Sequence, residues 1–229
     1  MNKTETYRIL DATQLKLIAM ICMLIDHLGD FFPNMIWMKA VGRIAMPLFS
    51  FMISEGYFYT HDKLAYLKRM LIFALISEIP FDLFIYGKLY WNHQNIMFTF
   101  AICIIALLLR DRIVEKKKDY TGLLLGNLAA LVIGAVLTLL LRTDYSFYPV
   151  LLILLFHHFR DYSHLVKNLI VFAFQVATRN MGHYIFGALS VIPLVLYNGK
   201  KGKGFKYLFY VFYPAHFLIL YLIRLLIIK

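Results

Sequence analysis

The sequence predicts an all-α fold, a polytopic integral membrane helical bundle of about nine transmembrane helices, with about eight to ten as the range. Composition is the first reason, because 61% of the 229 residues are hydrophobic and only 16% are charged, whereas soluble domains are less apolar and more highly charged. Length is the second, because apolar runs of about 15 to 22 residues suit a hydrocarbon core roughly 30 Å thick. Charge placement is the third, because most Lys and Arg residues stand in short loops between those runs, as in the cytoplasmic loops of membrane proteins.

Apolar runs follow one another from the start of the chain to its end, and each gives one predicted helix. The first contains KLIAMICMLIDHLGDFF, and the second contains Pro47, whose missing amide donor should bend it. The sixth to eighth runs are short for a full crossing, so they could be tilted, re-entrant or buried by their neighbours. The predicted spans are residues 13–32, 36–58, 66–86, 95–110, 121–141, 147–159, 165–179, 183–197 and 207–228.

Basic loops alternate with loops that hold few cations, and this alternation predicts the orientation of the chain. Because Lys and Arg favour the cytoplasmic side, the N-terminus is expected in the cytoplasm and, with nine spans, the C-terminus outside. The first apolar run should stay as a span, since no small-residue cleavage site follows it. Without repeats or linkers, a single transmembrane domain is predicted over residues 1–229. Within the basic loops, His157, His158 and Arg160 should form a solvated face, and KKGKGFK should set the topology or contact lipid headgroups.

Other classes of protein fit the sequence poorly. The formal net charge of +11 could suggest nucleic acid, but the cations belong to membrane-protein loops, so no nucleic-acid partner is predicted. Cys22 and Cys103 fall inside apolar runs, where they behave as small buried hydrophobes. The histidines are scattered, and neither an HExxH nor a CxxC spacing occurs, so no metal site is predicted.

Ionisable residues inside the first two spans are the strongest functional signal. His27 follows Lys16 by eleven residues, and eleven helical steps of about 100° place the two on one face, about 16 Å apart along the axis. His27 should lie roughly 8 Å below the outer surface and Arg43 roughly 10 Å below it, so the two share a depth. Asp26 precedes His27 and points about 100° away from it. Such groups are costly in hydrocarbon and often functional, although Lys16 could be only a snorkelling anchor.

The other residues of this group also have a structural interpretation. Asp26 could be a boundary residue or the internal partner of a cation, and a neutral His27 would be satisfied by one interhelical hydrogen bond. Arg43 at its depth needs an anionic or carbonyl partner, for which Glu78 and Asp82 are candidates.

Further polar residues in the spans could bind a substrate or hold helices together. Asn95 and Thr99 share a helix face at i, i+4, which favours interhelical hydrogen bonding. His216 follows Pro214 near the middle of the last span. The candidates for these substrate-binding or structural roles are Glu55, Glu78, Asn95, Thr99, Arg179 and His216.

Six short segments, which occur in order and cover nearly the whole chain, resemble the TraX family of conjugal-transfer membrane proteins. More distantly, the chain resembles membrane acyltransferases of the acyltransferase 3 and heparan glucosaminide N-acetyltransferase type. Those have a basic residue, ten intervening residues and a histidine on the first helix, matched here by Lys16 and His27, while Arg43 and Pro47 match their second helix. Lys at the first position replaces the commoner Arg, and the residues around Glu55 depart from the usual ending. The six segments are LIAMICMLIDHLG, GRIAMPLFSFMISEGY, RMLIFALISEIPFDL, NIMFTF, LSVIPLVLYNGKKG and YVFYPAHFLIL.

The resemblance implies acyl transfer in the bacterial cytoplasmic (inner) membrane, with acetyl-CoA as the acyl donor. The acceptor would be an amine or hydroxyl at the membrane or its outer face, on a protein N-terminus, a glycan or a lipid-linked sugar. A member of the family is associated with acetylating the N-terminus of a pilin subunit. Basic inner loops would hold the CoA phosphates electrostatically, with Lys16 at the entrance.

The resemblance also suggests roles for the intramembrane residues. His27, neutral at working pH, would act as general base on the acceptor. Arg43, helped by Asn95 or Thr99, would stabilise the oxyanion, and Asp26 belongs to the same predicted catalytic group. A covalent acyl-histidine route stays open.

Two other classes of function compete with the acyltransferase. A transporter or channel would use Asp26, His27 and Arg43 as a polar path, and it predicts inverted repeats, which the sequence lacks. A noncatalytic membrane scaffold would tolerate the exchange of these polar residues for apolar ones.

Overall fold

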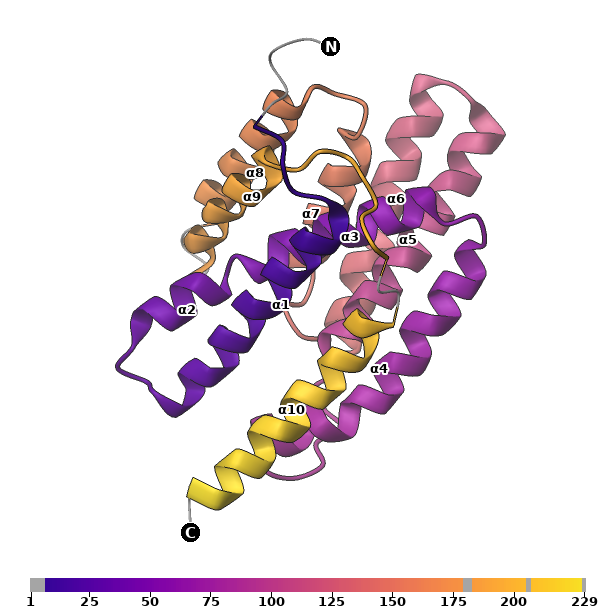
Figure 1. The fold of residues 1–229 in the computed structure, drawn as a ribbon. Helices are drawn as coiled ribbons and strands as arrows, with labels where there is room; N and C mark the ends of the chain where they lie inside the picture. Colours follow the sequence, from indigo (N-terminus) through magenta and orange to yellow (C-terminus); the bar gives the residue numbers. More distant parts are fainter. Residues whose placement is uncertain (1–6, 179–182, 205–206, 228–229) are drawn as a thin grey trace. The chain divides into compact units, whose positions relative to one another are not determined.

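The computed structural model describes residues 7–178, 183–204 and 207–227 (Figure 1). Within these ranges the chain is helical, with isolated β-bridges and no strand, so the predicted all-α class is confirmed. Among the described residues, each predicted span overlaps helical structure. The elements are α1 Ala12–Leu28, the 3-10 helix η2 Gly29–Phe31, α2 Ile36–Gly42, α3 Ala45–Tyr59, α4 Lys63–Tyr86, α5 Ile96–Lys117, α6 Tyr120–Leu140, α7 Tyr148–His158, α8 His164–Ala177, the 3-10 helix η4 His183–Ser190, α9 Val191–Val195 and α10 Leu208–Ile227.

Several helical segments have the length and the apolar character of membrane spans. Shorter apolar helices occupy the region where the sequence predicts short spans, from α7 to α9. The number of crossings and the side of the N-terminus stay predictions. Among the described residues, the 4 segments long and apolar enough to cross a membrane are Ala12–Phe31, Ile36–Tyr59, Tyr120–Leu140 and Leu208–Ile227.

The second predicted span is divided into two helices, α2 and α3, where the sequence predicts only a bend. The break falls at Arg43 and Ile44. Pro47 stands in the first turn of α3, where its missing amide proton costs little, but its ring would clash with the carbonyl of the residue four positions earlier, which is Arg43. Helix α2 therefore ends at Gly42, and Arg43 lies at the junction between α2 and α3.

The chain forms two compact units, of which the first comprises Met1–Met52 and His158–Phe209. In this unit α1 packs beside α2, and α8 packs beside η4 and α9. Leu10 N donates to Leu196 O at 2.9 Å, and Asn198 N donates to Leu10 O at 2.8 Å. The start of α1 therefore lies beside the loop that follows α9, as expected for two segments predicted on the same side of the membrane.

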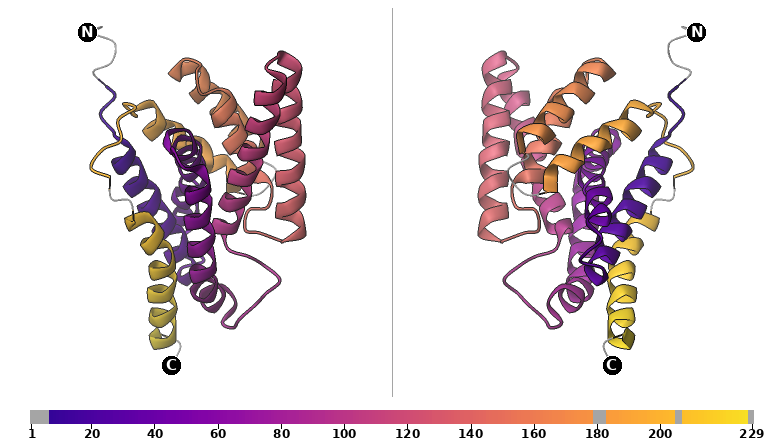
Figure 2. Two further views of the ribbon diagram at one scale, coloured as in Figure 1. Left: turned by 90° about the vertical axis from the view of Figure 1, so that its right-hand side faces the viewer. Right: turned by 90° about the vertical axis from the view of Figure 1, so that its left-hand side faces the viewer.

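The second unit comprises Ile53–His157 and Tyr210–Lys229. Its α5 and α6 lie side by side and antiparallel (Figures 1 and 2). Small residues spaced four apart on a helix let its neighbours approach closely, and a Cβ at Gly134 would overlap the side chain of Val150 on α7. The buried small residues of α6 are Gly122, Gly126, Ala130, Gly134 and Thr138.

Helix α10 runs in the same direction as α4. Tyr210 stacks on Phe73 with ring centroids 4.9 Å apart, and farther along both helices Arg224 Nη1 donates to Phe84 O at 2.8 Å. The C-terminal end of α10 therefore lies at the end of this unit where α4 finishes, which the sequence predicts to be outside.

Cysteine labelling tests the predicted orientation at the two ends of α5. Lys117 ends this helix and the exposed Trp91 precedes it, so the two are separated by about 33 Å of helix at 1.5 Å per residue. In a background without Cys22 and Cys103, a membrane-impermeant maleimide should label Trp91→Cys only from outside and Lys117→Cys only from the cytoplasm. Labelling of both from the same side would contradict the orientation.

Candidate functional site

Asp26 of α1 lies against two cations of the following helical segment. Its Oδ1 is 3.8 Å from Arg43 Nη2, and its Oδ2 is 3.7 Å from Lys39 Nζ. Lys39 Nζ also donates to the backbone oxygen of Asp26 at 2.8 Å and to Asp30 Oδ1 at 2.6 Å. Because Asp26 is only 8% exposed, these cations offset the cost of burying its charge. Asp26 is thus the internal partner of a cation, and Arg43 has a carboxylate on α1 where the sequence suggests one on the third span.

Gly42 lets α2 approach α1 at this point. A Cβ on Gly42 would overlap the side chain of Asp26. The absence of a side chain at the last residue of α2 therefore permits the ion pair between Asp26 and Arg43.

Gly42→Ala should lower the free energy of unfolding by about 2 kcal/mol, because the added methyl group must push the two helices apart. Thermal or denaturant unfolding in detergent measures the loss. Gly87→Ala is the control, since Gly87 has a φ of 68° but no atom within 4 Å of an added Cβ, which leaves only a backbone strain of about 1 kcal/mol. Equal losses in the two variants would show that the overlap with Asp26 is not the cause.

His27 and Lys16 lie on one uninterrupted helix, α1, as their predicted placement on one face requires. Both side chains are half-buried. His27 directly follows Asp26, whose carboxylate contacts Arg43. The structure therefore brings His27, Asp26 and Arg43, the predicted catalytic group, to the same end of α1.

Asn95 joins α4 to α5 in the second unit. It caps α5, since its Oδ1 accepts a hydrogen bond from Met97 N at 3.0 Å. Its Nδ2 donates to Ala74 O at 2.8 Å and also to Glu78 Oε2. An amide side chain has two N–H donors, and both are used, so the contacts of Asn95 are those of an interhelical link rather than of an oxyanion donor.

Thr99 and Asp82 make further links in the same unit. Thr99 Oγ1 donates to Asp144 O at 2.8 Å, which ties α5 to the loop after α6. Asp82 Oδ2 accepts a hydrogen bond from Tyr90 N at 2.7 Å and so holds the loop after α4. The contact of Thr99 supports its structural interpretation, whereas the suggested pair of Asp82 with Arg43 is not among these contacts.

The remaining predicted candidates are His216, Glu55 and Arg179. His216 is 3% exposed, its Nδ1 lies 3.0 Å from Phe212 O, and its ring stacks on Phe212 with centroids 5.0 Å apart. Glu55 is half-buried on α3. Arg179 lies outside the described residues.

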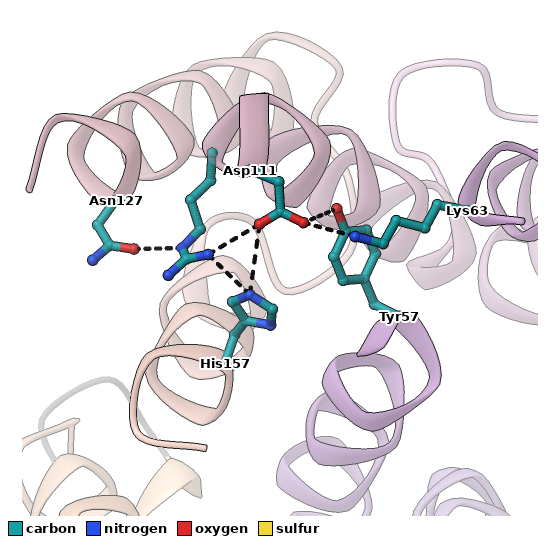
Figure 3. A network of polar contacts seen from close by, with 6 residues as sticks. Tyr57, Lys63, Asp111, Asn127 and His157 are labelled. Atoms are coloured by element: carbon teal, nitrogen blue, oxygen red, sulfur yellow. Dashed lines mark hydrogen bonds and ion pairs between the residues drawn. The ribbon is translucent and has the colours of Figure 1, made fainter. Parts of the chain in front are cut away.

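A polar cluster around Asp111, which the sequence does not predict, lies in the second unit (Figure 3). Asp111 Oδ2 accepts hydrogen bonds from Tyr57 OH and Lys63 Nζ, both at 2.8 Å. Asp111 Oδ1 is 3.0 Å from Arg110 Nη1 and 3.9 Å from His157 Nε2. One carboxylate therefore connects α3, α4 and α7 to the cytoplasmic end predicted for α5.

The Asp111 cluster extends to α6, because Arg110 Nε donates to Asn127 Oδ1 at 2.9 Å. Asp111 itself lies just beyond the apolar part of α5. Burial alone would raise the pKa of its carboxyl, but the hydrogen bonds from Lys63 and Tyr57 and the charge of Lys63 lower that pKa below its ordinary value. The cluster is thus built to hold an ionised carboxylate.

The predicted solvated basic face is wrong for His157. Its side chain is 9% exposed, and its ring stands edge-on to that of Tyr57 with centroids 5.7 Å apart. The Asp111 cluster had one local signal in the sequence, the triplet RDR at 110–112, which places a carboxylate between two Arg residues. Tyr57 and Lys63, the partners of Asp111, are 54 and 48 residues away from it in the sequence, so no sequence spacing could reveal them.

Comparison with known proteins gives matches along most of the chain. The family model described as TraX protein matches residues 11–224. The probable fimbrial assembly protein FimC, serogroup H1, of Dichelobacter nodosus is 30% identical over 238 residues, which cover 91% of this chain and 93% of that protein. The uncharacterized protein RP591 of Rickettsia prowazekii (strain Madrid E) is 42% identical over 67 residues, 28% of this chain and 25% of that protein. No solved structure matches the chain.

Proposed function

Because the chain belongs to the TraX family, we propose that it is a membrane acyltransferase that moves an acetyl group from acetyl-CoA to an amine or hydroxyl of an acceptor. One observation carries the proposal: the first unit groups the half-buried His27 with the ion pair of Asp26 and Arg43. A neutral imidazole and a fixed guanidinium are the proton acceptor and the anion stabiliser that acyl transfer needs. The resemblance of Lys16, His27 and Arg43 to the pattern of membrane acyltransferases supports the same reaction.

In the proposed mechanism, His27 is the general base. It takes the proton of the acceptor N–H or O–H while the acceptor nitrogen or oxygen forms its bond to the acetyl carbonyl carbon. Arg43 stabilises the negative charge that develops on the carbonyl oxygen. His27 then returns the proton to the sulfur as the carbon–sulfur bond breaks, so that the reaction is balanced. Asp26 is a positioning residue, because it holds the guanidinium of Arg43.

The donor supplies an acetyl group activated as a thioester, and the protein provides the site at which the donor enters. We propose that the chain crosses the bacterial inner membrane about nine times with its N-terminus in the cytoplasm, so that the donor enters past Lys16 at the start of α1. The acceptor is then reached from the membrane or its outer face. The name of the Dichelobacter nodosus relative, a probable fimbrial assembly protein, supports an acceptor that is exported, such as a protein N-terminus or a glycan.

Labelled acetyl transfer tests the proposed function. The purified protein is returned to vesicles made from bacterial membrane extract and supplied with acetyl-CoA labelled in the acetyl group. We expect a labelled product in mass spectra, with release of free CoA thiol in equal amount, and neither signal in vesicles that lack the protein. If the folded protein produces neither signal across protein, glycan and lipid fractions, the acyltransferase proposal is rejected.

A further inference from the structure

The loop Asn198–Gly204, with the sequence NGKKGKG, has a backbone path that only glycine adopts readily. Gly199, Gly202 and Gly204 have φ angles of 78°, 70° and 63°, in the left-handed region that other residues rarely occupy. Glycines at such positions form defined turns in which the backbone can approach a ligand closely. The loop is therefore a specified structure, whereas a topology determinant needs only the charges of its lysines.

Hydrogen bonds fix this loop to the start of α1. Ala12 N donates to Lys200 O at 2.8 Å, and Thr13 Oγ1 donates to Lys201 O at 3.3 Å. Gly204 N in turn donates to Thr13 Oγ1 at 3.2 Å. Gly202 lies so close to α1 that a Cβ would overlap the side chain of Asp11. The loop and the first turn of α1 thus form one rigid unit.

Four ammonium groups gather on this rigid unit. Lys200, Lys201 and Lys203 are exposed, and Lys16 is half-buried one turn into α1. Lys201 O accepts a hydrogen bond from Thr13, which stands three residues before Lys16 on α1, so the loop and Lys16 belong to the same end of that helix. Among the described residues none of the four has a carboxylate within 4.0 Å, and the neighbouring Asp11 caps α1 by accepting from Gln14 N. Like charges held together in this way favour binding of an anion.

We propose that the loop Asn198–Gly204 and Lys16 form a binding site for phosphate groups. This proposal rests on the proposed function, because it gives the phosphates of the donor a place to bind. It also gives Lys16 a more specific role. Lys acts toward phosphate as a point charge and does not require the bidentate geometry of Arg. The phosphates could belong to CoA or to the headgroups of anionic lipids, and the same chemistry binds both.

Calorimetric binding of CoA to the full-length protein in nanodiscs of zwitterionic lipid tests the site. Lys201→Gln should weaken CoA binding about tenfold, the effect of one charge-assisted contact. Gly202→Ala keeps every charge but displaces the loop, so it should weaken CoA binding to a similar extent. The matched control Lys116→Gln/Lys117→Gln removes two exposed charges from another basic loop and should change the dissociation constant less than about twofold. None of these variants should alter binding of pantetheine, which has no phosphate.

A second arm distinguishes the source of the phosphate, with vesicles of phosphatidylglycerol compared with phosphatidylcholine. If the loop variants weaken CoA binding in zwitterionic nanodiscs, the site holds the donor. In this arm, protection of the loop from protease reports binding of lipid. If CoA does not bind, but Lys201→Gln and Gly202→Ala reduce the protection that phosphatidylglycerol gives, the site holds lipid phosphate. The acetyl-CoA proposal then fails separately. If CoA binds equally to all variants, or if neither phosphate source responds to them, the phosphate site is disproved. A loss in Lys201→Gln that the Lys116→Gln/Lys117→Gln control matches disproves it as well, because net charge alone would then explain the effect.

Discussion

Replacement of His27 by Asn should lower labelled acetyl transfer by about a hundredfold or more, with little change in melting temperature. A positioned general base contributes about 10²- to 10⁴-fold to the rate. Asn can keep one hydrogen bond that an imidazole nitrogen makes, but it cannot accept a proton at neutral pH. Turnover of purified variants, matched for melting temperature in detergent, separates the loss of chemistry from the loss of packing.

Two comparisons make this result specific to the proposed site. His158→Asn, at a half-buried histidine outside the predicted catalytic group, should keep its activity. Arg43→Ala should also lose about a hundredfold, and the His27→Asn/Arg43→Ala double variant should lose less than the product of the single losses, because both residues act on one transition state. A fully active His27→Asn protein would remove His27 from the mechanism.

Asp111→Asn should lower the free energy of unfolding by about 2 to 3 kcal/mol, the second large effect that the structure predicts. The amide cannot replace the charge that Arg110 and Lys63 share, and a partly buried cation that loses its carboxylate is left with an unfavourable environment. Denaturant unfolding in detergent at neutral pH measures the change. Glu115→Gln removes the same charge from an exposed position of α5, and it should change the stability by less than about 0.5 kcal/mol.

The same variant gives a prediction for pH. The pKa of the Asp111 carboxyl is lower in the folded protein than its ordinary value, which is about 3.9 in an unfolded chain. Its stabilising contribution is therefore fully present above that ordinary value and is lost as the pH falls through the folded-state pKa. The stability difference between the wild type and Asp111→Asn should be constant near neutral pH and shrink below about pH 4. A difference that grew in acid would show that the carboxylate does not stabilise the cluster.

The sequence predicts the local features of this fold well because hydrophobic length and proline geometry act within one segment. The predicted spans 13–32 and 121–141 match Ala12–Phe31 and Tyr120–Leu140 within about one residue. The position of the break at Arg43 agrees with the predicted bend, since Pro47 disturbs the carbonyl four residues before it. The sequence locates the proline but does not separate a bend from a break.

The partners of the polar residues were harder to predict, because they depend on which helices touch. Asp26 and Arg43 stand 17 residues apart, and their contact requires the close approach that Gly42 permits. The Asp111 cluster draws on side chains from separate helices, so no periodicity within α5 identifies it. Residue chemistry could therefore be read from the sequence, whereas partner choice needed the packing of the helices.

The charges that meet between α1 and α2 have a consequence for how the chain enters the bilayer during synthesis. The segment of α1 and η2 forms the first arm of a helical hairpin and carries Asp26 and Asp30, and the segment from α2 to α3 forms the second arm and carries Lys39 and Arg43. The charges of these four residues cancel when the arms are together, but each arm is charged alone. Moving an isolated charge into hydrocarbon costs several kcal/mol. We expect the two arms to integrate as a pair, and Lys39→Gln/Arg43→Gln to slow membrane integration in a translocation assay more than Lys116→Gln/Lys117→Gln. Equal integration would mean that α1 inserts without help from its neighbour, whereas a specific delay would make the ion pair a requirement of biogenesis as well as of the finished site.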